Sequence, residues 1–319
     1  MKQSVTQAKN PYLRHINSLL ALLLAFTLFA CNNDEPAPAL PQPAMDKIEV
    51  GLGNNEIGVI GEDFHLNAEI LAGDKIENVQ VKIQQRSDET YAKEWSHEII
   101  WEQYKGAKNA TIHKHFNIPA DAAEGKYDFL IIVNDQNGTK FEEKRTLNIY
   151  AEENLPVNPQ LSIFNILTKE GFFYRRGNFI EPGQALQKDD TIASQVTISG
   201  VKGDGKMYLL LINKKFNHRP ESVEQIDFNK AIVYDVFAHE GWENADHFSN
   251  SVFDEETFTT IRNLPDFKIG AAADNNIPPA SIGGANTWES GTYYFGVVYK
   301  NTTYNMTFFH YIEIPIEIN

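Results

Sequence analysis

The sequence has one cysteine in 319 residues, Cys31, and 28 basic side chains against 43 acidic ones, which gives a formal charge of −15. A lone thiol cannot pair within the chain, so a disulfide framework is excluded. The shortage of positive charge argues against a nucleic-acid partner, because phosphate binding needs basic patches. The sequence also lacks a Gly-x-Ser-x-Gly nucleophile turn, a phosphate-binding glycine loop and a cysteine cluster. We therefore predict a protein that binds rather than catalyses, with no required cofactor.

Cys31 follows the apolar run Leu19–Ala30, which itself follows a basic N-terminal stretch. Twelve helical residues span about 18 Å, which is short of the ~30 Å hydrocarbon core and typical of a secretory signal. Leu28–Cys31 is similar to a bacterial lipobox, in which the cysteine is acylated. We predict a signal peptide at residues 1–30 and a lipid bilayer as the partner of acylated Cys31. The alternative is an ordinary signal peptide with a leftover cysteine.

The residues after Cys31 predict a spacer and a location. Asn32–Glu35 resembles the acidic tag that directs Bacteroidota lipoproteins to the outer face of the outer membrane. Alternating prolines in Pro36–Ala44 favour extended polyproline II. We therefore expect residues 31–45 to be a lipidated tether, and the protein to be anchored in the outer membrane facing outward.

Beyond the tether, apolar residues alternate with a period of two, as in Asp63–Leu71 and Asn78–Gln85. Short alternating segments separated by turn residues are typical of antiparallel sandwiches. The fold class is predicted as all-β, with two immunoglobulin-like β-sandwiches at 46–150 and 161–319, a linker at 151–160 and long loops in the second sandwich. The stretch 191–216 is read as two strands joined through Gly203-Asp204-Gly205.

A short motif occurs twice. Gly125-Lys126-Tyr127 and Gly291-Thr292-Tyr293 each open a predicted penultimate strand that is followed by a turn and one last strand. This arrangement resembles the tyrosine corner of immunoglobulin-like sandwiches, in which the phenol bonds back to nearby backbone. The alternative is coincidence between two aromatic strands.

The first predicted sandwich resembles an uncharacterised family of Bacteroidota lipoproteins, domain of unknown function 4625, over about residues 47–150. The resemblance implies secreted lipoproteins with an immunoglobulin-like fold and no established biochemistry. Members often have a further histidine where this chain has Asp128, so the resemblance implies an altered histidine set. No family is identified for the second sandwich. The residues that carry the resemblance are Asp63, His65, Leu66, Ala68, Gly106, Asn109, His113, His115, Ile118, Pro119, Ala120, Gly125, Tyr127, Phe129, Val133, Asp135 and Gly138.

Three histidines of this sandwich are the first candidate site. His113 and His115 lie two apart on a predicted strand, so their side chains share a face, and His65 alternates outward from Phe64 and Leu66. If the two strands are neighbours, these imidazoles converge on Zn²⁺ or Cu²⁺. The alternative is a set of exposed histidines on the solvent face of a sheet.

The second sandwich offers weaker candidates. A predicted loop at 239–248 concentrates acids and histidines but lacks the zinc-protease spacing. Aromatic side chains in loops stack on sugar rings or close the end of a sandwich. The only paired arginines suggest a partner-binding edge or a simple turn. The candidates are His239, Glu240, Glu243, Asp246 and His247 for a cation, and Trp242, Trp288, Arg175 and Arg176 for a glycan or partner.

Three functions remain open at this point. The first is a non-catalytic binding or interaction lipoprotein, serving an outer-membrane transporter or another surface protein. The second is a Zn²⁺- or Cu²⁺-binding lipoprotein that uses His65, His113 and His115. The third is a glycan-binding accessory lipoprotein that uses Trp242, Trp288 or the aromatic strand at Phe172.

Overall fold

The computed structural model describes residues 39–254 and 256–318. The predicted signal peptide, Cys31 and most of the tether lie outside these residues. Gln42–Asn319 forms one compact unit that contains both sandwiches. Within the described residues, no helix combines the length and the apolar character needed to cross a membrane.

The described elements are almost entirely strands, as the period-two alternation predicts. Five single-turn 3₁₀ helices interrupt them. The strands are β1 (Ala44–Val50), β2 (Ile57–Val59), β3 (Asp63–Leu71), β4 (Ile76–Gln85), β5 (Ser96–Trp101), β6 (Asn109–Asn117), β7 (Gly125–Asp135), β8 (Lys140–Tyr150), β9 (Gln160–Thr168), β10 (Gly171–Arg175), β11 (Asn178–Phe179), β12 (Leu186–Gln187), β13 (Thr191–Asn213), β14 (Ala231–Ser249), β15 (Val252–Asp254), β16 (Thr259–Arg262), β17 (Phe267–Lys268), β18 (Gly291–Asn301) and β19 (Met306–Glu317); the 3₁₀ helices are η1 (Glu102–Tyr104), η2 (Glu152–Asn154), η3 (Lys214–Phe216), η4 (Val223–Gln225) and η5 (Gly284–Asn286).

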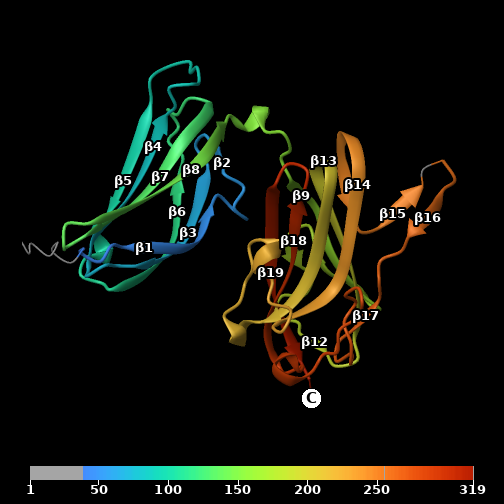
Figure 1. The fold of residues 1–319 in the computed structure, drawn as a ribbon. Coiled ribbons are helices and arrows are strands. Elements are labelled where there is room, and N and C mark those ends of the chain that lie inside the picture. The colour runs from blue at the N-terminus through green and yellow to red at the C-terminus, as the bar shows by residue number, and fades with distance from the viewer. Residues whose placement is uncertain (1–38, 255, 319) are drawn as a thin grey trace, which may run out of the picture. The chain divides into compact units, whose positions relative to one another are not determined.

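The first sandwich packs one sheet of order β1-β3-β6 against another of order β2-β8-β7-β4-β5 (Figure 1). The short strand β2 runs parallel to the last strand β8, whereas the other pairs are antiparallel. The inward residues of both sheets form one core, in which Phe64 of β3 meets Phe129 of β7 with ring centroids 5.6 Å apart. This is the immunoglobulin-like sandwich that the alternating pattern predicts.

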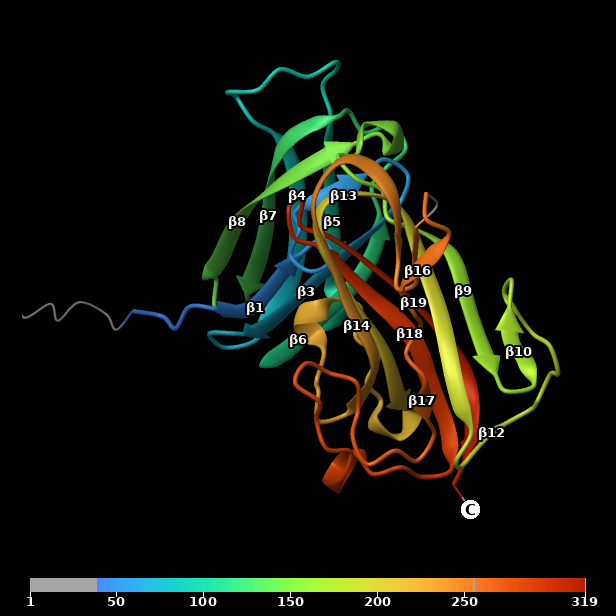
Figure 2. The ribbon, with the colours of Figure 1, turned by 90° about the vertical axis from the view of Figure 1, so that its right-hand side faces the viewer.

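The second sandwich is organised by the long strand β13 (Figure 2). The first part of β13 pairs with β9, its last part pairs with β18, and β14 pairs with it along most of its length. Phe164 of β9 and Phe295 of β18 meet in the core with ring centroids 5.7 Å apart, so the two parts of β13 belong to facing layers.

The prediction of two separate strands within 191–216 is wrong. Gly203-Asp204-Gly205 lies inside the continuous strand β13, and no hairpin forms there. Gly200 and Gly203 have φ of 72° and 71°, and the register with β14 shifts between Ile198 and Gly205. These glycines therefore permit bulges that bend the strand from one layer to the other. The tether prediction was also too long, because β1 already begins at Ala44.

Both predicted tyrosine corners are present. The Tyr127 hydroxyl donates to the carbonyl oxygen of Ala123 at 2.8 Å, and the Tyr293 hydroxyl donates to that of Glu289 at 3.0 Å. Each bond reaches back four residues from a fully buried ring at the start of the penultimate strand. The repeated motif therefore has the same structural role in both sandwiches.

Candidate metal centre

The register between β3 and β6 brings the three predicted histidines together. His65 lies directly opposite His115, and His113 lies opposite Asn67, two residues further along β3. Because side chains alternate along a strand, all three imidazoles are on the outer face of the sheet, away from Phe64 and Leu66. A shift of one residue in this pairing would place the histidines of β6 on the core face.

The imidazole nitrogens are close enough to share one ion. One nitrogen from each of His65, His113 and His115 lies within 4.8 Å of the others. His65 Nδ1 and His115 Nε2 are 3.4 Å apart. Ligands of a tetrahedral Zn²⁺, each about 2.0–2.2 Å from the ion, lie roughly 3.4 Å from one another. The spacing of these two nitrogens thus already matches one edge of a zinc tetrahedron.

A carboxylate lies beside the His115 ring and another beside the His65 ring, each on the side away from the other histidine. Asp63 Oδ2 lies 2.6 Å from His115 Nδ1, and Glu49 Oε2 of β1 lies 3.7 Å from His65 Nε2. With its proton on Nδ1 facing Asp63, His115 has its Nε2 lone pair toward His65. Metal-binding histidines commonly donate their other N–H to a carboxylate in this way, which fixes the tautomer and orients the ring.

Glu49 is held as a carboxylate beside His65. Burial raises the pKa of Glu49, but the neighbouring His65 ring and the hydrogen bond from the Gly53 N–H together lower it by more, so the pKa lies below its ordinary value. A half-buried carboxylate therefore faces the most buried of the three imidazoles.

A third carboxylate reaches the cluster from the second sandwich. Glu221 Oε2 lies 4.0 Å from His65 Nδ1 and 3.9 Å from His115 Nε2. This oxygen is buried and makes no hydrogen bond, and the same is true of His65 Nε2. Buried polar atoms are nearly always hydrogen-bonded, so two unpartnered ones in a single cluster require an explanation.

The prediction that His65 faces solvent is wrong. Its side chain is only 3% exposed, whereas His113 and His115 are exposed. Residues of β1 and of the segment around Glu221 surround the ring of His65, and strand alternation alone could not show this cover. Asp128 belongs to β7 in the opposite sheet and pairs with Lys144 at 2.6 Å.

The second predicted cation site is not a loop. Residues 239–248 lie within β14. His239 is buried, with Nε2 2.9 Å from the Tyr299 hydroxyl and Nδ1 3.0 Å from the Gly203 carbonyl oxygen, whereas His247 is exposed beside Asp246. The remaining predicted ligands, Glu240 and Glu243, are exposed along the same strand.

The residues predicted to bind a glycan or a partner do not form one site. Trp288 is half-buried, donates to the Ala271 carbonyl oxygen at 2.9 Å and packs on Tyr293, so it closes part of the core. Trp242 packs against His239 and borders an open hollow of about 740 Å³. Arg175 covers the ring of Phe172 at 4.3 Å, and Arg176 occupies the following turn with a φ of 53°.

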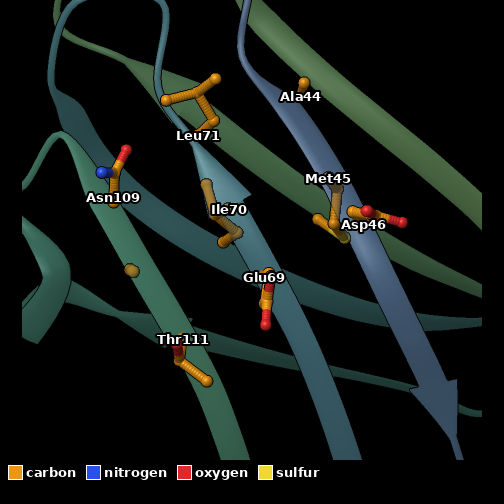
Figure 3. A pocket seen from close by; sticks show the side chains of 9 residues that line it. Ala44, Met45, Asp46, Glu69, Ile70, Leu71, Asn109 and Thr111 are labelled. Carbon is orange, nitrogen blue, oxygen red and sulfur yellow. The ribbon is translucent and has the colours of Figure 1, made fainter.

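Sequence reasoning missed the three carboxylates of the histidine cluster. Asp63 was detectable, since it lies two residues before His65 and therefore on the same face. Glu49 and Glu221 gave no local signal, because each comes from a distant segment. The same sheet face also has a shallow hollow of about 470 Å³ beyond the cluster, around Glu69, Leu71 and Thr111 (Figure 3).

Comparison with known proteins identifies the first sandwich. Residues 29–150 match the family described as Domain of unknown function (DUF4625). No curated protein matches the chain. Solved structures with weak similarity include dimeric latent PorU from Porphyromonas gingivalis (9% identity, TM-score 0.28, covering 90% of this chain and 21% of that one) and native E. coli alpha-2-macroglobulin (11%, 0.26, 89% and 14%). The chain spans about a fifth of the length of the first of these proteins and about a seventh of the length of the second. The TM-scores are too low to support a shared fold or function.

Proposed function

We propose that this chain, whose residues 29–150 match the DUF4625 family, binds a single Zn²⁺ or Cu²⁺ ion through His65, His113 and His115. The convergence of three imidazole nitrogens within 4.8 Å carries the proposal. Imidazole is a preferred ligand of both ions, and the nearby carboxylates supply negative charge that favours a cation.

The arrangement favours a bound cation. His65 is buried, and its Nδ1 faces the Nε2 of His115 and an acidic oxygen of Glu221. If Asp63 and Glu49 take the outer protons of the two rings, then two nitrogen lone pairs and a carboxylate face the same space. The buried Glu221 oxygen is costly to leave unpartnered beside the buried His65 ring, and a positive charge between them removes that cost.

Titration calorimetry and metal analysis of the full chain test the proposal. We expect one equivalent of Zn²⁺ or Cu²⁺ per chain, and loss of that binding in His113→Ala and His115→Ala. His247→Ala, an exposed histidine of the second sandwich, is the control and should bind like the wild type. A wild-type chain that binds neither ion would disprove the proposed function.

We also propose that the protein acts by binding rather than by catalysis, as a lipoprotein of the outer membrane that faces outward. The lipobox-like Leu28–Cys31 and the acidic, proline-rich tether support this part of the proposal. A surface partner such as an outer-membrane transporter fits such a location. Labelling with a palmitate analogue should mark the wild type and not Cys31→Ser, and external protease should digest the protein on intact cells.

A further inference from the structure

We infer that Glu221 is the fourth ligand of the proposed metal ion, so that the ion fastens the second sandwich to the first. This inference rests on the proposed histidine site and adds to it a ligand and a consequence. The decisive juxtaposition is the approach of the Glu221 carboxylate to His65 and His115.

The geometry fits one ion between these groups. Glu221 Oε2 is 4.0 Å from His65 Nδ1 and 3.9 Å from His115 Nε2, and the two nitrogens are 3.4 Å apart. The two distances to Glu221 are too long for hydrogen bonds. They are only slightly longer than the roughly 3.4 Å expected between two ligands of tetrahedral zinc. A small movement of the carboxylate toward the ion completes the coordination. The buried Oε2, which has no hydrogen-bond partner, then binds the ion.

The segment that carries Glu221 is held in place. Gln225 accepts a hydrogen bond from the Glu221 N–H at 3.0 Å and donates one to Glu49 Oε2 at 3.3 Å. The Tyr311 hydroxyl donates to the Pro220 carbonyl oxygen at 2.8 Å, and the Arg219 guanidinium lies over the Tyr311 ring at 5.4 Å. Glu221 is therefore presented by an anchored turn, as a preorganised ligand requires.

Four protein ligands make a closed site. Closed tetrahedral sites are typical of structural zinc, whereas catalytic sites keep one position for water or substrate. Hydrogen bonds already join the same two sandwiches, from Lys300 Nζ to the Gly53 carbonyl oxygen at 3.2 Å and from Asn305 Nδ2 to the Asn54 carbonyl oxygen at 3.1 Å. The ion adds a ligand bond across this contact, so occupancy strengthens the association of the two sandwiches.

Metal titrations of the full chain test the fourth ligand. Co²⁺, which reports tetrahedral coordination by strong visible absorption, and Zn²⁺ are titrated into the wild type, Glu221→Ala and Glu221→Gln. We expect at least about tenfold weaker Zn²⁺ binding and a changed Co²⁺ spectrum in both variants, with the isosteric Gln variant guarding against a folding defect. Glu240→Gln, an exposed acid of β14, is the matched control and should behave as the wild type.

Calorimetric unfolding tests the consequence. We expect saturating Zn²⁺ to bring the unfolding of both sandwiches into one transition in the wild type, and to raise only the transition of the first sandwich in Glu221→Gln. If the Glu221 variants bind Zn²⁺ with wild-type affinity, spectrum and unfolding, the inference is wrong while the three-histidine site stands. If the wild type binds no metal, both proposals fail together.

Discussion

At the scale of single residues, a carboxylate beside each ring orients His115 and His65 of the histidine cluster. His115 is directed by Asp63 at 2.6 Å, and His65 by Glu49 at 3.7 Å. Each carboxylate sits on the far side of the imidazole from the shared space. Such neighbours set the orientation and the basicity of the ligand nitrogen, so they belong to the site although they need not touch the ion.

Removing one of these neighbours gives a sharp test. Asp63→Ala should weaken Zn²⁺ binding about 10- to 100-fold, because His115 loses the acceptor that fixes its tautomer and ring angle. Glu62→Ala, an exposed acid one residue earlier, is the control for lost negative charge. Equal dissociation constants for wild type and Asp63→Ala, measured by titration calorimetry, would show that Asp63 does not position His115.

At the scale of elements, pairing register and bulges decide what each strand presents. The unbroken pairing of β3 with β6 places His65 opposite His115. In the second sandwich, by contrast, the irregular pairing of β13 with β14 bends β13 between layers. A regular ladder therefore presents the proposed metal ligands, whereas an interrupted one builds the core of the other sandwich.

The tyrosine corners carry a stability prediction at this scale. Tyr127→Phe and Tyr293→Phe each leave a backbone carbonyl without its donor beside a buried ring. We expect the unfolding free energy to fall by about 1–3 kcal/mol in each variant, measured by denaturant titration. Tyr294→Phe is the control, since the described residues give its hydroxyl no hydrogen bond. Unchanged stability in Tyr127→Phe and Tyr293→Phe, relative to Tyr294→Phe, would contradict this assignment.

At the scale of the whole molecule, two histidines make the stability of the second sandwich sensitive to acid. Burial lowers the pKa of His239, and although the Gly203 carbonyl and Asp204 raise it in part, the pKa remains below its ordinary value. Burial, with the charge of Arg219, also lowers the pKa of His310. Both residues belong to the second sandwich, whose folded state therefore favours neutral imidazoles.

The lowered pKa values of His239 and His310 predict a pH dependence of stability. As the pH falls through about 6.5, these histidines bind protons in the unfolded chain but stay neutral in the folded second sandwich. The unfolding free energy therefore decreases by at most about 1.4 kcal/mol per pH unit for each such histidine. We expect the stability difference between wild type and His239→Gln to change between pH 7 and pH 5, in chelator. The exposed His247→Gln should follow the wild type across that range. Parallel curves for wild type and His239→Gln would disprove the contribution of His239.

The sequence by itself determined the all-β class, both tyrosine corners and the shared face of His113 and His115, because these features depend on the two-residue period of a strand and on short local motifs. It could not determine that His65 would pair with His115, since alternation fixes the face of a side chain but not its neighbour on the next strand. Only the tertiary structure brought Glu49 and Glu221 to the cluster and buried His65, because contacts between distant segments leave no periodic signal in the chain.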